Sequence, residues 1–174
     1  MIYYTSSELS HRLQVALAKW KRWSREFLPP DPLGGLQSGF ARQFSLREAF
    51  RVFLGGCLVA DLKFSIPESR QILADLNGWL KKAGFYQLQP AGGTAAGFFR
   101  IYIVPQAPGR FGYTIRAVPR EVETQAHTNG QAREIYTLAM AAGQPEPVAC
   151  GDLETARCLG ISALYRRFVA GLKR

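Results

Sequence analysis

The chain has few of the residues that build metal centres and disulfide frameworks. It contains 3 cysteines and 2 histidines, and Cys57, Cys150 and Cys158 include no Cys-x-x-Cys pair. An odd number of widely spaced cysteines is not typical of a zinc site or of a disulfide scaffold. We therefore expect no metal and no disulfide, and we interpret the three cysteines as small buried hydrophobic residues in a reducing compartment.

Long hydrophobic runs are also absent. No apolar stretch approaches the roughly 18 residues that a membrane-spanning helix needs. Residues 1–10 lack the basic-then-apolar pattern of a signal peptide. We therefore expect a cytoplasmic protein without membrane contact.

Catalytic motifs are missing as well. The glycine-rich segment 92–97 is followed by neither Lys-Ser/Thr nor a helix start, so it is not a phosphate loop. Glu121, Glu123 and His127 lie close together, but no nucleophile accompanies them, and we interpret them as a solvated loop. The sequence predicts no enzyme and no cofactor.

Acidic side chains are scarce relative to basic ones. Against 13 Asp and Glu stand 22 Lys and Arg, which gives a net charge of +9 and a pI near 9.8. Such a charge favours a polyanionic partner, with nucleic acid ahead of an acidic membrane surface. A surplus that serves only solubility is the alternative. The excess is concentrated in residues 9–51, which hold 8 basic and 3 acidic side chains.

Three capping boxes mark helix starts in the first half. Each pairs a hydroxyl at the N-cap with a glutamate three residues later, and they begin at Thr5, Ser45 and Ser65. The expected helices are a short one after Thr5, a second over 16–27, an apolar one after Ser45 and one from Ser65 to about Ala83. Gly84 is expected to end the last of these helices.

The second expected helix has two different faces. Leu17, Trp20 and Phe27 fall at helical spacing and are expected in the core, with Trp23 beside them. The opposite side is cationic, and its members are Lys19, Lys21, Arg22 and Arg25. Glu26 is the only acid in the segment, so pairing along the helix does not account for the run. Such a face suits the phosphates and base edges of a DNA major groove, and an ordinary solvated surface is the alternative.

A proline- and glycine-rich loop follows the cationic helix. Residues 28–32 stop the helix, and the next glycines bracket an expected hairpin over 36–44. Helix, turn, cationic helix, loop and helix is the order of a winged helix-turn-helix. We expect Arg42 and Gln43 to hold the DNA backbone from this wing. Gly55-Gly56, in the middle of the apolar helix, predicts a close helix crossing.

Four segments of the first half follow an order that is known from one family. They are YTSSELS (4–10), WKRWSREFLPP (20–30), FARQFSLRE (40–48) and LKFSIPES (62–69). In order and in nearly all spacings they resemble the DNA-binding domain of the mercury-resistance regulator (MerR) family. The resemblance implies a winged helix whose second helix enters the major groove and whose wing arginine, Arg42 here, contacts phosphate. After Gly84, strand-like sequence replaces the family's long dimerisation helix, so metal sensing and that mode of dimerisation are not implied.

The second half predicts a small sheet. Aromatic and β-branched runs bounded by Gly and Pro indicate strands at 85–89, 98–104 and 111–118, the last two forming a hairpin around 105–110. Residues 135–140 fit either a helix or a strand, and Gly151-Asp152 is expected to cap a final helix. The aromatic side chains of this half either line a ligand pocket or, as we prefer, form a core: Tyr86, Phe98, Phe99, Tyr102, Phe111 and Tyr113.

The sequence thus predicts an α+β protein with two domains. Residues 1–84 would form a mostly helical winged helix-turn-helix domain, and residues 85–174 a small α+β domain with an antiparallel sheet that senses a ligand or assembles a homodimer. The predicted function is a transcriptional regulator that binds double-stranded DNA. The alternatives are a phage or mobile-element architectural or packaging protein, a protein-interaction adaptor on the same fold, and an enzyme sited in the second half.

Overall fold

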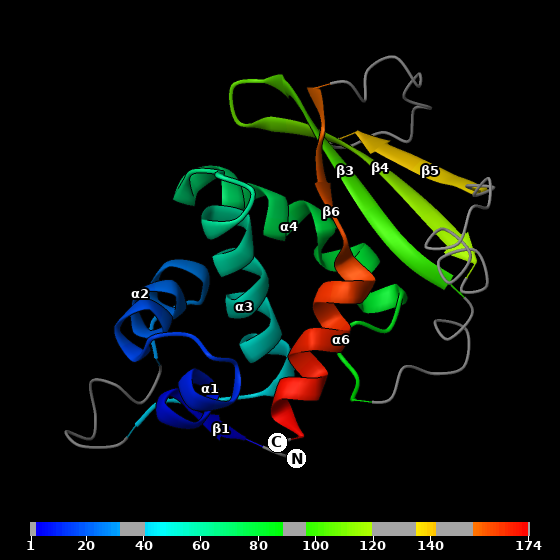
Figure 1. Cartoon of the computed structure of the whole chain (residues 1–174). Coiled ribbons are helices and arrows are strands. Elements are labelled where there is room, and N and C mark those ends of the chain that lie inside the picture. Colours follow the sequence, from blue (N-terminus) through cyan, green and yellow to red (C-terminus); the bar gives the residue numbers. More distant parts are fainter. Residues whose placement is uncertain (1–2, 32–40, 89–96, 120–134, 142–154, 174) are drawn as a thin grey trace. The chain divides into compact units, whose positions relative to one another are not determined.

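The computed structural model describes residues 3–31, 41–88, 97–119, 135–141 and 155–173. The chain divides into two compact units, Met1–Gln89 with Tyr165–Arg174, and Pro90–Leu164. The second unit is therefore an insertion in the sequence of the first. Helices combine with antiparallel sheets, which confirms the α+β fold class (Figure 1).

The helices of the first unit begin where the sequence predicts. They are α1 (Ser6–Arg12), α2 (Leu17–Phe27), α3 (Leu46–Ala60) and α4 (Ile66–Lys82). Complete capping boxes form at Thr5, Ser45 and Ser65, so each hydroxyl accepts a backbone N–H that the helix leaves without a partner. Gly84 follows α4 with φ of 79°, as expected of a helix-ending glycine. None of the described helices is both long and apolar enough to cross a membrane.

A tight turn joins α1 to α2. It consists of four residues, Leu13–Ala16, and Gln14 adopts the left-handed conformation with φ of 57°. Two hydrogen bonds close the turn: the Val15 N–H donates to Ser10 O at 3.0 Å, and Ser10 Oγ donates to Val15 O at 2.8 Å. Two helices joined in this way have the connection length of a helix-turn-helix.

The crossing of α2 and α3 depends on two glycines. A Cβ at Gly55 would lie 2.5 Å from Phe27 Cδ2, and a Cβ at Gly56 would overlap the Trp23 ring. The predicted close helix crossing is therefore confirmed. Trp20, Trp23 and Phe27 are buried as predicted, and Trp23 and Phe27 pack against the two glycines of α3.

The prediction for Leu17 is wrong. This side chain is 38% exposed, although its spacing places it in register with Trp20. Leu17 is the first residue of α2, and the residues that cover the later turns of the helix do not cover the first one. Sequence periodicity describes an angle around the helix axis and not the length of the partner that packs against it.

A two-stranded sheet closes the first unit. In it β1 (Tyr4–Thr5) pairs antiparallel with β2 (Gln43–Phe44), with Tyr4 opposite Phe44. The buried Phe44 ring meets Trp20 edge-on, with ring centroids 5.9 Å apart, so the sheet packs against α2. Residues 32–40, which hold most of the predicted wing hairpin, lie outside the described residues.

The end of the chain completes the core of the first unit. Helix α6 spans Ile161–Leu172, and its residues from Tyr165 onward belong to this unit. The rings of Tyr165 and Phe168 lie 4.9 and 5.2 Å from that of Phe50, so α3 lies between α2 and the end of α6 (Figure 1). The structure thus divides the chain just after the predicted boundary at residue 84, but it returns the last ten residues, Tyr165–Arg174, to the helical unit.

The second unit contains a four-stranded antiparallel sheet of order β5-β4-β3-β6. The strands are β3 (Gly97–Ala107), β4 (Arg110–Pro119), β5 (Ile135–Ala141) and β6 (Arg157–Leu159). The predicted hairpin is confirmed, with Ala107 opposite Arg110. Ile101, Ile103, Phe111 and Tyr113 are buried, so these two aromatic rings belong to a core, as we preferred.

Two predicted elements of the second half are wrong. Phe85–Leu88 form turns and bends and not a strand, because the Phe85 ring packs on Trp79 near the end of α4 and on Phe50 of α3. Tyr86 also contacts Phe50 and therefore belongs to the first unit. Arg157–Leu159 pair with Ile101–Ile103 as a strand, so the final helix starts at Ile161 and not near Asp152. Residues 151–154 lie outside the described residues.

The glycine crossing generates a test by substitution. Gly56→Ala should lower the free energy of unfolding by about 1–3 kcal/mol, because the new methyl group collides with the buried Trp23 ring. Gly78→Ala in α4 is the matched control, since nothing lies within 4 Å of its added Cβ. It should raise the free energy of unfolding by up to about 1 kcal/mol through helix propensity. Urea unfolding measures both, and equal stabilisation by the two variants would contradict the crossing.

Candidate nucleic-acid interface

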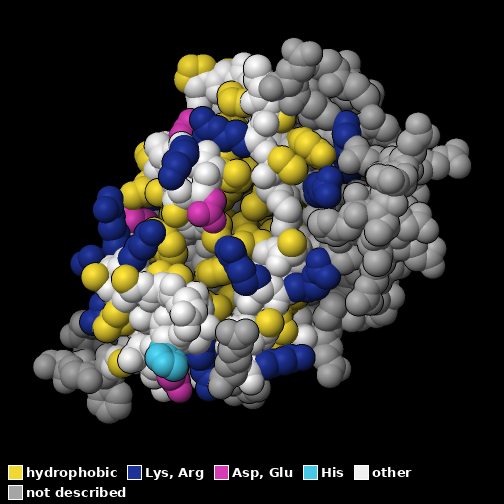
Figure 2. All heavy atoms as spheres, in the orientation of Figure 1, with side chains coloured by type: hydrophobic (Ala, Val, Ile, Leu, Met, Phe, Trp, Pro, Cys, Tyr) yellow, Lys and Arg dark blue, Asp and Glu magenta, His cyan; other side chains and the backbone are white. Residues whose placement is uncertain are grey.

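The outer face of α2 carries three neighbouring cations. Lys21, Arg22 and Arg25 are exposed and lie opposite the buried Trp20 and Phe27. Among the described residues, none of these three side chains has a hydrogen-bond or ion-pair partner. Figure 2 shows Lys and Arg side chains over α2 on the face in view. These cations are therefore available to a partner outside the chain.

Lys19 lies on the flank of this face. Its side chain is exposed, and its Nζ atom lies 5.1 Å from the centroid of the Trp23 ring. A cation over the face of an indole is attracted by the negative potential of the ring. The structure therefore separates the four predicted cations of α2: Lys21, Arg22 and Arg25 share the outer face, and Lys19 lies over Trp23 at its flank.

The single acid of α2 is occupied by another helix. Glu26 Oε2 lies 2.5 Å from Nη2 of Arg70, which belongs to α4. The glutamate therefore does not neutralise Arg22 or Arg25 along the helix. The positive charge of the outer face remains uncompensated by neighbours on α2.

Three arginines from three other elements donate to the end of α2. We call them the arginine clamp: Arg42, just before β2, donates from Nη1 to Pro29 O at 2.9 Å, Arg51 from Nε to Phe27 O at 2.9 Å, and Arg70 from Nε to Glu26 O at 2.7 Å. The last carbonyls of a helix have no intrahelical donors and carry partial negative charge. Arg51 and Arg70 satisfy two of these carbonyls, and Arg42 satisfies the Pro29 carbonyl just beyond the helix, so the clamp fixes the end of α2 and the chain that follows it.

The position of Arg42 differs from its expected role in the wing. Its side chain is 17% exposed, and Nη2 lies 3.5 Å from Glu48 Oε1. Its guanidinium also covers the Phe44 ring at 5.5 Å. Arg42 is thus engaged inside the protein, whereas its neighbour Gln43 is exposed on β2. The sequence does not indicate that Arg51 and Arg70 anchor α2, because their partners lie 24 and 44 residues away and no spacing pattern connects them.

The described residues contain no cluster of three or more His, Cys, Asp or Glu side chains that could hold a metal. Glu121, Glu123 and His127 lie outside the described part of the chain, as does Cys150. Cys57 is buried, as predicted, and burial raises the pKa of its thiol to about 12. Cys158 is exposed, so the prediction of burial is wrong for that residue; its strand lies at the edge of the sheet.

Comparisons with family models, with curated proteins and with solved structures gave no match for this chain. The resemblance to the mercury-resistance regulator family therefore stays a prediction that depends on four sequence segments.

The clamp predicts how an Arg42 variant behaves. Arg42→Met should lower the free energy of unfolding by about 1–2 kcal/mol, because Pro29 O and Glu48 lose a charged donor. Lys82→Met, at an exposed cation in the last turn of α4, is the control and should change it by less than about 0.5 kcal/mol. Urea unfolding of both variants distinguishes the roles. Unchanged stability with weakened DNA binding would instead support a wing contact to phosphate.

The two described cysteines should differ in reactivity. At pH 8 the Cys57 thiol is almost entirely protonated, since its pKa is raised from 9.0 to about 12, and only the thiolate reacts. Exposed Cys158 should therefore be alkylated by iodoacetamide in the native protein, and Cys57 only after unfolding in urea. Peptide mass spectrometry over time measures both rates. Equal labelling of the two thiols in native buffer would contradict this assignment.

Proposed function

We propose that this protein is a transcriptional regulator that binds double-stranded DNA with α2 in the major groove. One observation carries the proposal: Lys21, Arg22 and Arg25 are exposed on one face of the second helix of a helix-turn-helix and have no partner among the described residues. An α-helix of about 10–12 Å diameter fits a major groove that is about 12 Å wide. Arginine and lysine at such a face contact phosphate oxygens and the acceptor edge of guanine.

The anchoring of α2 supports this use of the face. The inner side of the helix is fixed by the glycine crossing with α3, and its end by the arginine clamp. The cations are therefore presented by a rigid support, which reduces the conformational entropy lost on binding. Exposed Leu17 lies beside them, and an apolar side chain at this place suits the methyl group of thymine.

The remaining parts of the proposal are assigned to other segments. Gln43, exposed on β2, would contact the DNA backbone near the wing. The second unit would supply the sensing or assembly function, including a homodimer. Arg42 would act through the clamp, by orienting α2, rather than by touching DNA.

The proposal predicts a charge-dependent loss of affinity. Lys21→Ala combined with Arg25→Ala should weaken duplex binding by at least about tenfold near 100 mM salt, and should reduce the slope of log K against log salt by about 2. The matched control is Lys81→Ala with Lys82→Ala, which removes the same charge from exposed positions on α4. Fluorescence anisotropy with a labelled duplex at several salt concentrations measures both slopes.

Selection from random duplex DNA at about 50 and 200 mM salt separates the possible roles. Recovery of a defined motif supports a sequence-specific regulator, and an inverted repeat would further indicate a dimer. Salt-sensitive binding without a motif would indicate an architectural or packaging protein and not a sequence-specific regulator. Equal affinity of the α2 variant and its α4 control would overturn the assignment of the face.

A further inference from the structure

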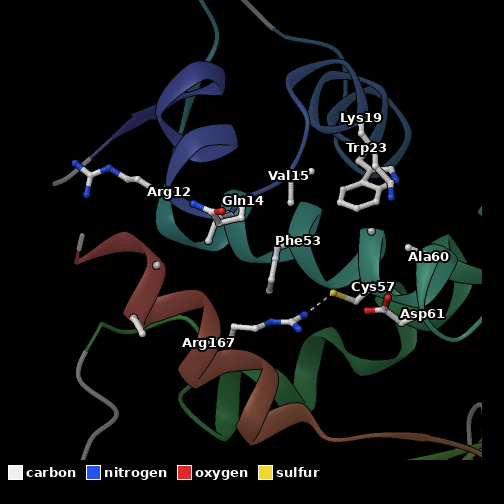
Figure 3. Close-up of a pocket in the computed structure, with 14 residues that line it drawn as sticks. Arg12, Gln14, Val15, Lys19, Trp23, Phe53, Cys57, Ala60, Asp61 and Arg167 are labelled. Carbon is white, nitrogen blue, oxygen red and sulfur yellow. Dashed lines mark hydrogen bonds between the residues drawn. The ribbon is translucent and has the colours of Figure 1, made fainter.

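The first unit contains a pocket behind the helix-turn-helix. It has a volume of about 440 Å³ and is formed by the turn after α1 together with α2, α3 and the end of α6 (Figure 3). All of its lining residues belong to the first unit. This volume falls in the range of small-molecule sites, about 300–1,000 Å³.

The inner wall of the pocket is aromatic and apolar. Trp23 of α2 and Phe53 of α3 contribute rings, and Cys57 contributes a buried thiol that is protonated at neutral pH. Gly56 also lines the pocket, and the Trp23 ring packs directly against its backbone. A flat apolar body is the ligand shape that such a wall accommodates.

Two cations lie over this wall. The Arg167 guanidinium lies 5.4 Å from the centroid of the Phe53 ring, and the Lys19 ammonium lies over Trp23. Arg167 comes from α6 and points toward Cys57, whose Sγ accepts from Nη2 at 3.6 Å (Figure 3). Within the described residues, neither Arg167 nor Lys19 has an oxygen acceptor.

The hydrogen-bonding capacity of Arg167 is therefore largely unused. A guanidinium has five N–H donors, and a thiol sulfur is only a weak acceptor. The third cation of the pocket, Arg12, is occupied, because its Nη1 donates to Leu172 O at 2.5 Å. The one acid of the pocket, Asp61, lies near the Cys57 thiol, where its charge helps to raise the thiol pKa, and it forms no ion pair with Arg167 among the described residues. The pocket thus offers a planar donor that matches a carboxylate.

We propose that this pocket binds a small aromatic carboxylate. The ring of the ligand lies against Trp23 and Phe53, and its carboxylate receives two parallel hydrogen bonds from Arg167, with Lys19 as a second cation. The excess of cations over the single acid Asp61 disfavours a cationic ligand. A neutral amide could offer Arg167 one carbonyl oxygen, but it would supply neither the second oxygen of a carboxylate nor the negative charge that opposes the two cations.

The pocket shares a helix with the candidate DNA interface. Lys19 and Trp23 line the pocket, and both belong to α2. A ligand that binds them changes the charge and the side-chain positions of the helix that would enter the groove, so ligand and DNA affinities are linked. This consequence rests on the proposed function, whereas the ligand site itself does not. The proposed pocket would place a ligand-sensing site in the first unit, whereas the sequence suggested that the second unit senses a ligand.

The test uses the full chain without DNA and a pair of matched probes. Benzoate and benzamide have nearly the same shape, but only benzoate carries a carboxylate. Titration with benzoate should produce a saturable shift of the Trp23 indole N–H signal in NMR spectra, assigned with Trp23→Phe, and benzamide should produce none. Arg167→Gln should weaken benzoate binding by at least about tenfold. Lys173→Gln, an exposed position past the end of α6, should leave it unchanged.

Three results would overturn the proposal: no saturable shift with benzoate, equal shifts with the two probes, or unchanged affinity in Arg167→Gln. If Arg167→Gln does not fold, Lys19→Gln takes its place, with weaker benzoate binding expected and unchanged binding counting against the site. Benzoate binding by a protein that does not bind DNA would refute only the proposed function. DNA binding without benzoate binding would refute only the pocket.

Discussion

The direction of α2 is the constraint on which the first unit depends. Backbone carbonyls at its C-terminal end require donors, and the clamp supplies them from α3 and α4, while Arg42 donates to Pro29 O just past the helix. Arg51 joins α2 to α3, Arg70 joins it to α4, and Arg42 holds the chain just after the helix, so α2 cannot turn or slide without breaking these hydrogen bonds. The glycine crossing acts on the inner side of the same helix, where Trp23 and Phe27 approach the α3 backbone too closely for any larger residue. The arginine clamp thus fixes the end of α2, and the glycine crossing fixes its inner face.

This constraint explains why the charge of α2 stays on its outer face. The carbonyls of Glu26 and Phe27 at the helix end already accept hydrogen bonds from Arg70 and Arg51, and the Glu26 carboxylate is paired with Arg70. No neighbour on the helix therefore draws Lys21, Arg22 or Arg25 inward. A cluster of like charges repels itself, and it persists only where solvent or a partner of opposite sign compensates it. A polyanion is such a partner, and in its absence the cluster is screened by salt.

The sequence predicted what short-range physics determines. Capping boxes, the helix-ending Gly84 and the hairpin each depend on residues within a few positions, and all of them formed as predicted. The errors arose where distant partners decide. Leu17, the first residue of α2, is exposed although its spacing matches that of the buried residues further along the helix. Residues 157–159 paired with β3 although they fit a helix. Arg42 contacts Pro29 O and Glu48, and its predicted contact with the DNA backbone stays a prediction. For the candidate site, the α2 cations were visible in the sequence, whereas the clamp and the pocket were not.

The same reasoning shows why the pocket could not be read from the sequence. Its residues come from α1 and its turn, from α2, from α3 and from α6, and Arg167 follows Phe53 by more than a hundred residues. Only the return of the chain after the inserted unit brings Arg167 to α3, where Phe168 packs against Phe50 and Phe53. The aromatic packing that completes the helical core therefore also positions the cation of the pocket. Since α6 begins in the second unit and ends in the first, the first unit gains both its last core residues and its ligand-binding arginine from sequence that follows the insertion.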